Sequence, residues 1–552
     1  MKQLYLDIME KSFHAYDRKR ICDYITEVQK NGLSEHGFAR LAADLAILNA
    51  FGRCTDYHDV MLEMMDLCCR QMPHRKAANE FSVREIVCAI NLLDQKKIVD
   101  SGRIQGWIAD LSRFEAQTDY NVVTRPFESK GNWAAFGAVS ELVRSKMCGV
   151  DSSSFIDNQV SSLLGDFDEN GMYRDPHEPM VYDCVTRVLV DYLLFAGYNG
   201  KYRDILAENV EKASYYAVRL PSVSGELPFG GRSNQFLHNQ MWLAADMEFL
   251  AAYYASKGDR DKAGQFKATA RKATENLTRW LEEPSLRSIK NRYPVESMIG
   301  CEEYGYFNKY MITLASIAFV AYQFSDDTIV PTKAPCEADT YVCRTSEAFH
   351  KVVLNGFGYS MELDTNADFH YDACGLGKLQ KNGYPDTLCL SVPFPPKNAF
   401  YQTEKDNERA MSLCIWHDIE GKIVYGSEIP LTLVEKTIEP NAIKAVFSQQ
   451  LDGCEVNTVY SLSPTGAELC TDDNANGFAV PVFEFDGESY TDIRENAGEI
   501  SVCYRGYTCR FIFDGTLDKS YERYYNRNGR YRVYKISSKK LHIMFEKKEE
   551  VQ

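Results

Sequence analysis

The stretch 241-MWLAADMEFLAAYYA-255 spaces its apolar residues three and four positions apart, which is the period of an α-helix with a buried face. Short turns with Gly, Asn and Asp separate this run from similar ones, so the helices are expected to pack as antiparallel neighbours. We predict roughly ten to twelve helices over residues 1–330, in a curved solenoid or a closed toroid. The other clear helical runs are 38–51, 83–95, 134–147 and 185–198.

After about Val330 the pattern changes to short runs with a period of two residues. Runs such as 478-FAVPVFEFDG-487 and 500-ISVCYRGYTCRFIFDG-515 alternate apolar and polar side chains and contain turn residues. They predict antiparallel strands. We therefore expect two domains, a helical domain over 1–330 that carries most of the chemistry and an antiparallel β-sandwich over 331–552.

The composition disfavours several classes of function. A net charge of −16 argues against nucleic acid and anionic membranes as partners, because the field of the protein repels phosphates. The 17 cysteines form no CxxC pair and no Cys/His ladder, which argues against structural zinc and for reduced thiols. The sequence shows neither a signal peptide nor a run of about 18 apolar residues. We expect a cytoplasmic protein that needs no metal or organic cofactor.

Two polar-aromatic clusters lie in the middle of the helical half. In 130-KGNWAAFG-137, Asn132 and Trp133 could form a platform for a sugar ring, or they could be a helix cap followed by a core tryptophan. The segment 166-DFDENGMYRDPHEPMVYDCVTR-187 crowds carboxylates and arginines around a turn. Asp175, Asp183 and Arg187 are its candidates for an active-site rim, and a solvated loop is the competing interpretation.

The third cluster is 227-LPFGGRSNQFLHNQMW-242. Arg232 precedes a predicted helix start, where free N–H groups and the helix dipole favour an anion. Gln235, His238 and Asn239 lie within about one helical turn and could read a bound carboxylate-bearing ligand. The alternative is a capped helix with one buried histidine.

The fourth cluster, 300-GCEEYGYFNKYM-311, precedes an apolar helix. At helical spacing Glu303 and Tyr306 would point together, and Glu302, Tyr304 and Lys309 lie close by in the sequence. One carboxylate kept ionised and one packed against tyrosines would suit acid/base cleavage of a glycosidic bond. An acidic first helical turn explains the glutamates equally well but leaves the tyrosines unexplained.

Three of these segments, GMYRDPHEPMVYDCVTR, FGGRSNQFLHNQ and GCEEYGYFNKYMITLAS, together resemble the heparinase II/III-like enzymes. More narrowly, the chain is similar to the bacterial exo-acting β-glucuronidases of glycoside hydrolase family 154. The resemblance implies an (α/α)6-type toroid followed by a β-sandwich, and a terminal uronic acid that water removes with the help of two acidic residues. Relatives in the wider group are lyases that use a tyrosine and a histidine, for which Tyr306 and His238 are the candidates here.

We therefore expect a glycoside hydrolase that removes a terminal β-linked glucuronic acid from an oligosaccharide. One of Glu302 and Glu303 would protonate the leaving oxygen, and Asp175 or Asp183 would activate water. The uronate would be held by the predicted binding residues Asn132, Trp133, Arg187, Arg232, Gln235, His238, Asn239, Tyr304 and Lys309.

Two alternatives remain open on the sequence, a uronate lyase acting by β-elimination and a glycan-binding protein without catalytic activity. In the β half, His370 lies in the long polar segment 368–396, which we expect to reach over the mouth of the toroid. Exposed strands of this half could support a homodimer.

Overall fold

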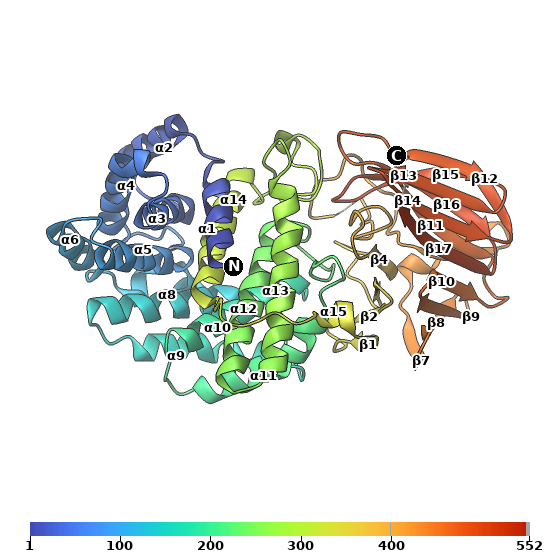
Figure 1. The fold of residues 1–552 in the computed structure, drawn as a ribbon, viewed down its shortest axis with the longest axis horizontal. Helices are drawn as coiled ribbons and strands as arrows, with labels where there is room; N and C mark the ends of the chain where they lie inside the picture. Colours follow the sequence, from blue (N-terminus) through green and yellow to red (C-terminus); the bar gives the residue numbers. More distant parts are fainter. Residues whose placement is uncertain (398, 548–552) are drawn as a thin grey trace.

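The computed structural model of the chain describes residues 1–397 and 399–547. Its first half is helical and its second half consists of antiparallel sheets, as the sequence pattern predicts. The predicted second domain runs to residue 552, and residues 548–552 lie outside the described ranges. Figure 1 shows the helices on one side of the molecule and most of the sheets, in orange and red, on the other.

The helical half is a closed ring. Its inner helices are α3 (His36–Ala50), α5 (Val83–Gln95), α8 (Asn132–Cys148), α10 (Met180–Phe195), α12 (His238–Ser256) and α14 (Phe307–Phe324). Each packs against the next in this order, and α14 packs back onto α3. This closure distinguishes an (α/α)6-type toroid from an open solenoid.

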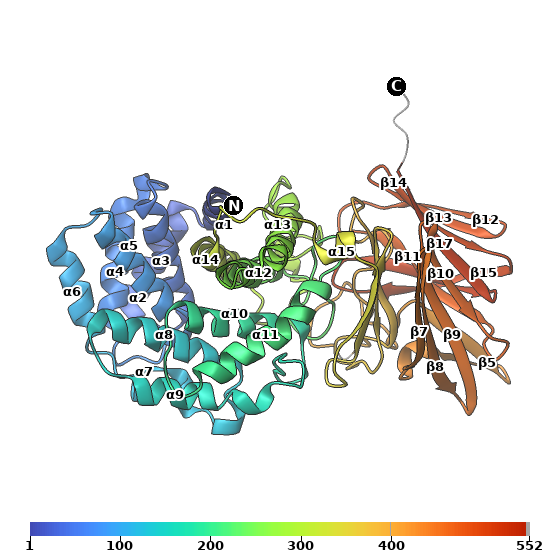
Figure 2. The ribbon, with the colours of Figure 1, turned by 60° about the horizontal axis from the view of Figure 1, so that its bottom comes forward.

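An outer layer of helices alternates with the inner ring along the chain. It consists of α1 (Lys2–Phe13), α2 (Arg18–Asn31), α4 (His58–Gln71), α6 (Ser101–Leu111), α9 (Ser153–Ser161), α11 (Arg203–Arg219) and α13 (Arg260–Leu281). The first of these packs on the last inner helix, and both views show α1 in blue beside the much later α14 (Figures 1 and 2). Two short helices, α7 (Ala116–Asp119) and α15 (Pro335–Ala338), complete the set in the described ranges.

The two layers differ in how their helices are buried. In the inner helix α3 every residue from Gly37 to Ala50 is buried. The outer helix α2 buries only Ile21, Ile25 and Val28, which lie four and three positions apart on one face. An inner helix that is buried on all sides meets open space mainly at its ends, so side chains that can reach a ligand are expected near the helix termini.

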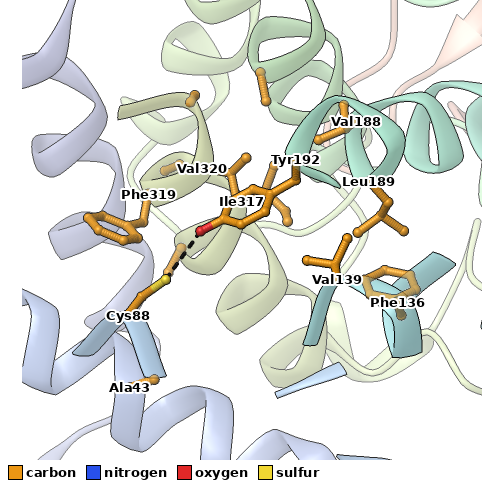
Figure 3. Packing of buried hydrophobic residues seen from close by; sticks show 14 of the residues in the cluster. Ala43, Cys88, Phe136, Val139, Val188, Leu189, Tyr192, Ile317, Phe319 and Val320 are labelled. Atoms are coloured by element: carbon orange, nitrogen blue, oxygen red, sulfur yellow. Dashed lines mark hydrogen bonds between the residues drawn. The ribbon is translucent and has the colours of Figure 1, made fainter. Parts of the chain in front are cut away.

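The core of the helical half lies between the inner helices. Phe136 and Val139 of α8 belong to the same buried cluster as Leu189 of α10 and Phe319 of α14 (Figure 3). Burial of such apolar surface stabilises the fold by about 25 cal/mol per Å². The buried Tyr192 hydroxyl forms a hydrogen bond with the Cys88 sulfur at 3.3 Å, as Figure 3 shows.

Within residues 331–397 and 399–547, the β half contains three antiparallel sheets. The first sheet pairs β1 (Tyr341–Arg344), β2 (Lys351–Gly356), β3 (Tyr359–Asp364) and β4 (Gly375–Lys381) in that order. The second has the order β12 (Asp492–Asn496), β13 (Glu499–Tyr504), β14 (Tyr507–Phe513), β17 (Lys540–Lys547), β10 (Gly466–Thr471), β9 (Cys454–Ser463), β8 (Ala442–Leu451), β7 (Thr432–Glu439). The third is β15 (Thr516–Tyr525), β16 (Arg530–Ser537), β11 (Gly477–Phe485), β5 (Cys414–Ile419), β6 (Lys422–Tyr425). Apolar side chains from all three sheets meet in one core, which makes this half a β-sandwich.

Two-residue turns fix the register of the hairpins. Asp452 and Gly453 connect β8 to β9, and Leu451 pairs directly with Cys454. Both turn residues have positive φ, 48° and 86°, which matches the right-handed twist of the flanking strands. The register places the alternate residues of β8 in the core, in agreement with the period-two pattern of the sequence.

The change from helix to sheet falls between Phe324, where α14 ends, and Tyr341, where β1 begins. The predicted boundary at residue 330 lies in this connection. In the described ranges, no helix has both the length and the apolar character that crossing a bilayer requires.

Candidate active site

A cavity of about 680 Å³ lies at the N-terminal ends of the inner helices. This volume is in the range of pockets that hold small organic ligands. All six inner helices contribute lining residues at or near their first turn: Glu35 and His36 for α3, Phe81 for α5, Asn132 for α8, Tyr182 for α10, His238 for α12 and Lys309 for α14. The inner helices are therefore parallel to one another, and their N-termini converge on one space.

The lining of the cavity is cationic although the chain is acidic. Two carboxylates, Glu35 and Asp175, face it among the described residues. Against them stand five cationic side chains, Arg40, Arg125, Lys130, Arg232 and Lys309. The converging helix N-termini add the positive ends of their dipoles. A chain with a net charge of −16 thus concentrates positive potential in one cavity, which favours an anionic ligand.

Aromatic side chains form the walls between these charges. The guanidinium of Arg125 lies 3.9 Å from the ring centroid of Trp133. Tyr371 and Phe400, which come from the β half, also line the cavity and are stacked with centroids 5.6 Å apart. Ring faces beside charged groups are what a ligand with both apolar faces and polar edges requires, and a sugar acid is such a ligand.

Asp175 and Arg232 form the central ion pair. Asp175 is 1% exposed and accepts hydrogen bonds from the Arg232 guanidinium and from the main-chain N–H of Asn132. Burial raises the pKa of Asp175, and the positive charge of Arg232 acts in the opposite direction. The guanidinium also lies 4.1 Å from the ring centroid of Tyr182.

A row of hydroxyl groups continues from this pair. The hydroxyl of Ser233 lies 3.3 Å from that of Tyr182 and 3.1 Å from that of Tyr304. Burial raises the pKa of both tyrosines, so at neutral pH their hydroxyls carry protons. These hydroxyls can donate to or accept from a ligand in the cavity.

His238 faces the same region and is neutral at physiological pH. Burial lowers the pKa of His238 to about 3, and the charge of Arg40 acts in the same direction. Its ring packs against Phe236 and Tyr310. Its Nδ1 is buried without a hydrogen-bond partner among the described residues.

Glu35 and Lys309 line the cavity at the starts of α3 and α14. The Glu35 carboxylate accepts from the Tyr24 hydroxyl and from the main-chain N–H of Gly37, and it caps α3. Burial lowers the pKa of Lys309, with Glu35 acting in the opposite direction. No ion pair of Lys309 with a described residue is present at hydrogen-bond distance, so its charge is available to a ligand.

The backbone around the cavity is strained. Ala78, His177 and Ser233 line it with positive φ values of 53°, 68° and 57°. Non-glycine residues rarely adopt this left-handed conformation, and it persists only where surrounding contacts enforce it. Such strain gathers at sites where a side chain or N–H group must point in one direction.

Seven of the residues predicted from sequence meet at this cavity. They come from the four polar-aromatic clusters, which the ring brings together although they are spread over the sequence. They are Asn132, Trp133, Asp175, Arg232, His238, Tyr304 and Lys309.

The predicted carboxylates of the fourth cluster lie elsewhere. Residues 300–306 form a loop, and α14 begins only at Phe307, so the helical spacing assumed for Glu303 and Tyr306 is wrong. Neither of these two exposed side chains lines the cavity. Glu302 is buried behind it, bonded to Arg527 at 2.6 Å and to the main-chain N–H of Ser233 at 2.5 Å.

Four further candidates serve the packing around the cavity. Asp183 and Arg187 form a buried ion pair within α10, and Arg187 also binds Asp246 of α12 at 2.8 Å. The Gln235 side chain accepts from Asn528, and the Asn239 side chain donates to the main-chain oxygen of Ser233.

His370 bonds Asp368 at 2.7 Å on the surface. Its ring lies 6.2 Å from that of His177, which does line the cavity. From the segment 368–396 it is the neighbouring Tyr371 that reaches the cavity.

Several lining residues were not singled out from the sequence, namely Glu35, His36, Arg40, Arg125, Lys130, His177, Tyr182 and Tyr310. Lys130, His177, Tyr182 and Tyr310 lie inside the quoted clusters, whereas Glu35, His36, Arg40 and Arg125 lie outside them. Charged residues at the starts of buried helices are the sequence signal that indicates Glu35 and Arg40.

Among the described residues, Glu10, His14 and Cys54 form a group that could hold a metal, with ligand atoms within 4.8 Å of one another. These residues do not line the cavity.

No protein-family model and no curated protein matches the chain. Among solved structures, it is similar to heparinase III, with a TM-score of 0.37 and 11% identity, covering 93% of this chain and 85% of that one. A glycosyl hydrolase family 88 protein from Bacteroides vulgatus has a TM-score of 0.37 and 9% identity, covering 58% of this chain and 99% of that one. The chondroitin lyase ODV-E66, a baculovirus envelope protein, has a TM-score of 0.22 and 9% identity, covering 79% of each chain. These likenesses are distant, and the chemistry of the cavity has to be inferred from the residues of this chain.

Proposed function

We propose that the chain is an enzyme that binds a uronic acid in the toroid cavity and hydrolyses its glycosidic bond. The observation that carries this proposal is Asp175, a carboxyl group 1% exposed at the wall of a cationic cavity. Burial raises the pKa of this carboxyl group and so favours its protonated form, which can transfer a proton to a leaving oxygen.

The uronate carboxylate is bound by Arg232 and Lys309 in this proposal. These residues lie at the starts of α12 and α14, which are neighbours in the ring. Asn132 offers an amide for the ring hydroxyls, and Trp133 and Tyr371 offer ring faces. Arg187, which the sequence also suggests for this role, is engaged in buried ion pairs and takes no part.

The reaction uses Asp175 and Glu35. Asp175 gives its proton to the glycosidic oxygen as the bond from this oxygen to the anomeric carbon breaks. A water molecule attacks the anomeric carbon, and Glu35 accepts the proton of that water. Their helices, α10 and α3, are three steps apart in a ring of six, so the carboxyl groups flank a ligand from opposite sides. A separation of about 6.5–9.5 Å between the two carboxyl groups would leave room for water and give inversion of the anomeric configuration, whereas about 5–5.5 Å would give retention.

The β half favours a chain end over the middle of a polysaccharide. Tyr371 and Phe400 add a wall to the cavity from outside the helical ring. A site walled in this manner accepts a terminal sugar more readily than an internal one. We therefore keep a terminal β-linked glucuronic acid as the proposed substrate group.

β-Elimination is the second candidate, and the cluster of Tyr182, Tyr304 and His238 favours it. An elimination needs a base for the proton at C5 of the uronate and an acid for the leaving oxygen. The neutral imidazole of His238 could accept the C5 proton, and the Tyr304 hydroxyl could give its proton to the leaving oxygen. Tyr306, the tyrosine suggested by the sequence, lies outside the cavity, so Tyr304 replaces it here.

Mass spectrometry of the products separates these possibilities. The protein is incubated with a panel of oligosaccharides capped by glucuronate, and the summed mass of the products is compared with that of the substrate. A gain of one water supports hydrolysis, whereas an unsaturated uronate without added water supports elimination. If none of the capped oligosaccharides is cleaved, although binding is seen by calorimetry, the chain is a glycan-binding protein.

A further inference from the structure

The loop that carries Arg232 is held on one side by Asp372 of the β half and on the other by Glu302, which is itself bonded to Arg527 of the β half. The main-chain N–H groups of Gly231 and Ser233, the two neighbours of Arg232, each donate to a buried carboxylate. Gly231 donates to Asp372 at 2.7 Å and Ser233 donates to Glu302 at 2.5 Å. Arg232 therefore stands between two anchored peptide groups.

This loop has a conformation that its own sequence does not favour. Gly230 and Gly231 have φ values of 143° and 75°, and the non-glycine residues Ser233 and Gln235 have φ values of 57° and 64°. A left-handed conformation at two residues with side chains is costly and persists only where other contacts over-determine it. The loop thus needs external supports.

Asp372 supplies the first support. It is 3% exposed and follows β3 in the β half, 141 residues after Gly231. Phe229, which precedes the loop, packs on the sheet that contains β3. Its ring centroid lies 3.9 Å from the ammonium of Lys351 in β2. A Cβ atom at Gly377 of β4 would lie 2.4 Å from the Phe229 ring, so the sheet and the loop are in close contact.

Arg527 supplies the second support through Glu302. Its guanidinium donates to the Glu302 carboxylate at 2.6 Å and to the main-chain oxygen of Gly300 at 2.5 Å. It also lies 3.6 Å from the ring centroid of Tyr401, and its side chain is 1% exposed. The Glu302 oxygen that Arg527 fixes is the same Oε1 that accepts from Ser233.

We propose that Asp372 and Arg527 are positioning residues, which set Arg232 against Asp175 by holding the peptide groups on either side of it. This inference rests on the proposed function in so far as Arg232 and Asp175 act on a uronide. It makes the catalytic geometry of the helical ring dependent on two residues that lie outside the ring.

Hydrogen exchange measured by mass spectrometry tests the geometry without any substrate. In Asp372→Ala the amide of Gly231 is expected to exchange faster, and in Arg527→Met the amide of Ser233. Asp486→Ala is the matched control, because Asp486 is 2% exposed and its side chain binds Tyr504, the 488–489 turn and Arg292, with no hydrogen bond to the described residues 229–235. Unchanged exchange over residues 229–235 in both variants would overturn the inference, whether or not the wild type cleaves uronides.

Kinetics test whether the anchoring matters for the reaction. The probe is p-nitrophenyl β-D-glucuronide. Asp372→Ala and Arg527→Met are expected to lower kcat/KM by about 100-fold, because a shift of a substrate-binding group such as Arg232 by about 1 Å can cost this much in rate. Asp372→Asn keeps an oxygen for the Gly231 N–H and should recover most of the activity. Asp486→Ala should stay within about threefold of the wild type.

The pH profile distinguishes positioning from a general loss of structure. If Arg232 moves away from Asp175, its charge no longer favours the ionised carboxylate, and the alkaline limb of kcat/KM moves to higher pH. A uniform loss of activity with an unmoved limb would contradict the positioning role. If the wild type cleaves no uronide while the 229–235 amides exchange faster in the variants, the anchoring stands and the proposed function fails.

Discussion

Arg232 and Asp175, which are 57 residues apart in the sequence, form a hydrogen-bonded ion pair at the wall of the cavity. The pair joins the loop before α12 to the loop before α10, two neighbours in the inner ring. It opposes the effect of burial on Asp175, since the positive charge of Arg232 favours the ionised carboxyl group while burial favours the protonated one. The protonation state of Asp175 is therefore set by a contact that mutation can remove.

Replacement of Asp175 by Asn removes the proposed proton donor while keeping its size. We expect kcat/KM toward a glucuronide to fall by about 10²- to 10⁴-fold, the range for loss of a general acid. A colorimetric assay with p-nitrophenyl β-D-glucuronide measures this. Activity within tenfold of the wild type, in a variant with unchanged circular dichroism, would exclude Asp175 as the acid.

Replacement of Arg232 by Gln changes the pH dependence. A proton donor must be protonated, so activity declines as pH rises through the pKa of Asp175. Loss of Arg232 removes the charge that lowers this pKa, and the alkaline limb of kcat/KM is expected to move to higher pH. Lys309→Gln is the control, because it lines the same cavity and should weaken binding while the limb stays in place.

The variant Tyr304→Phe removes one hydroxyl group, and its effect on the rate is expected to differ between hydrolysis and elimination. If water cleaves the bond with Asp175 as the acid, the variant loses only a substrate contact, and kcat/KM is expected to fall less than about tenfold. Loss of activity by more than about 10²-fold, together with unsaturated products from the wild type, would instead assign Tyr304 to an elimination. The measurement is initial rate combined with product mass.

The adjacent glutamates of the 300–311 stretch are expected to differ in their effect on stability. Glu302→Gln leaves the buried Arg527 without its counter-charge and should destabilise the fold by roughly 3–5 kcal/mol. Glu303→Gln changes an exposed side chain and should stay within about 0.5 kcal/mol. Urea unfolding of the two variants and the wild type gives the comparison, and equal midpoints for both variants would contradict the buried ion pair.

The buried His238 is expected to make the free energy of unfolding depend on pH. Its pKa in the folded state is about 3, below the ordinary value of 6.5, so below pH 6.5 the unfolded chain binds a proton that the folded chain does not. Stability is therefore lost as pH falls from 6.5 toward 3, by about 2 kcal/mol at pH 5. His238→Phe, whose ring fits between Phe236 and Tyr310, should lose less stability than the wild type between pH 7 and pH 5. Identical pH dependence in the two proteins would show that His238 titrates normally.

The helical and β halves follow from residue periodicity, because burial on one face or in alternate positions leaves a direct mark on the sequence. The position of the cavity follows in part, since inner helices such as α12 are buried over most of their length and have Arg232 and His238 just before and at their starts. The clusters found from sequence lie at such starts. Their mutual approach depends on ring closure, which no local pattern encodes.

The errors in the site have two physical origins. The glutamates were assigned on an assumed helical turn, but residues 300–306 are a loop, and Arg527 draws Glu302 away from the cavity. Glu35 and Arg40 were missed because the segment 35–40 shows only two separated charges at the beginning of an apolar helix and no dense polar-aromatic cluster. Their role becomes visible only when α3 meets α14, more than 270 residues later, through Arg40 and Thr313.

Closure of the ring sets the order in which the protein can become complete during synthesis. Arg40 meets Thr313 across 273 residues, and Asp44 meets Ser316 across 272, so α3 has no partner at that seam until α14 has left the ribosome. The loop of Arg232 gains its second support later still, because Arg527 is synthesised 225 residues after Glu302, the residue that it holds. A ribosome that stops after α14 but before Arg527 therefore releases a chain that has the cavity residues of the helical ring but lacks the last support of their geometry.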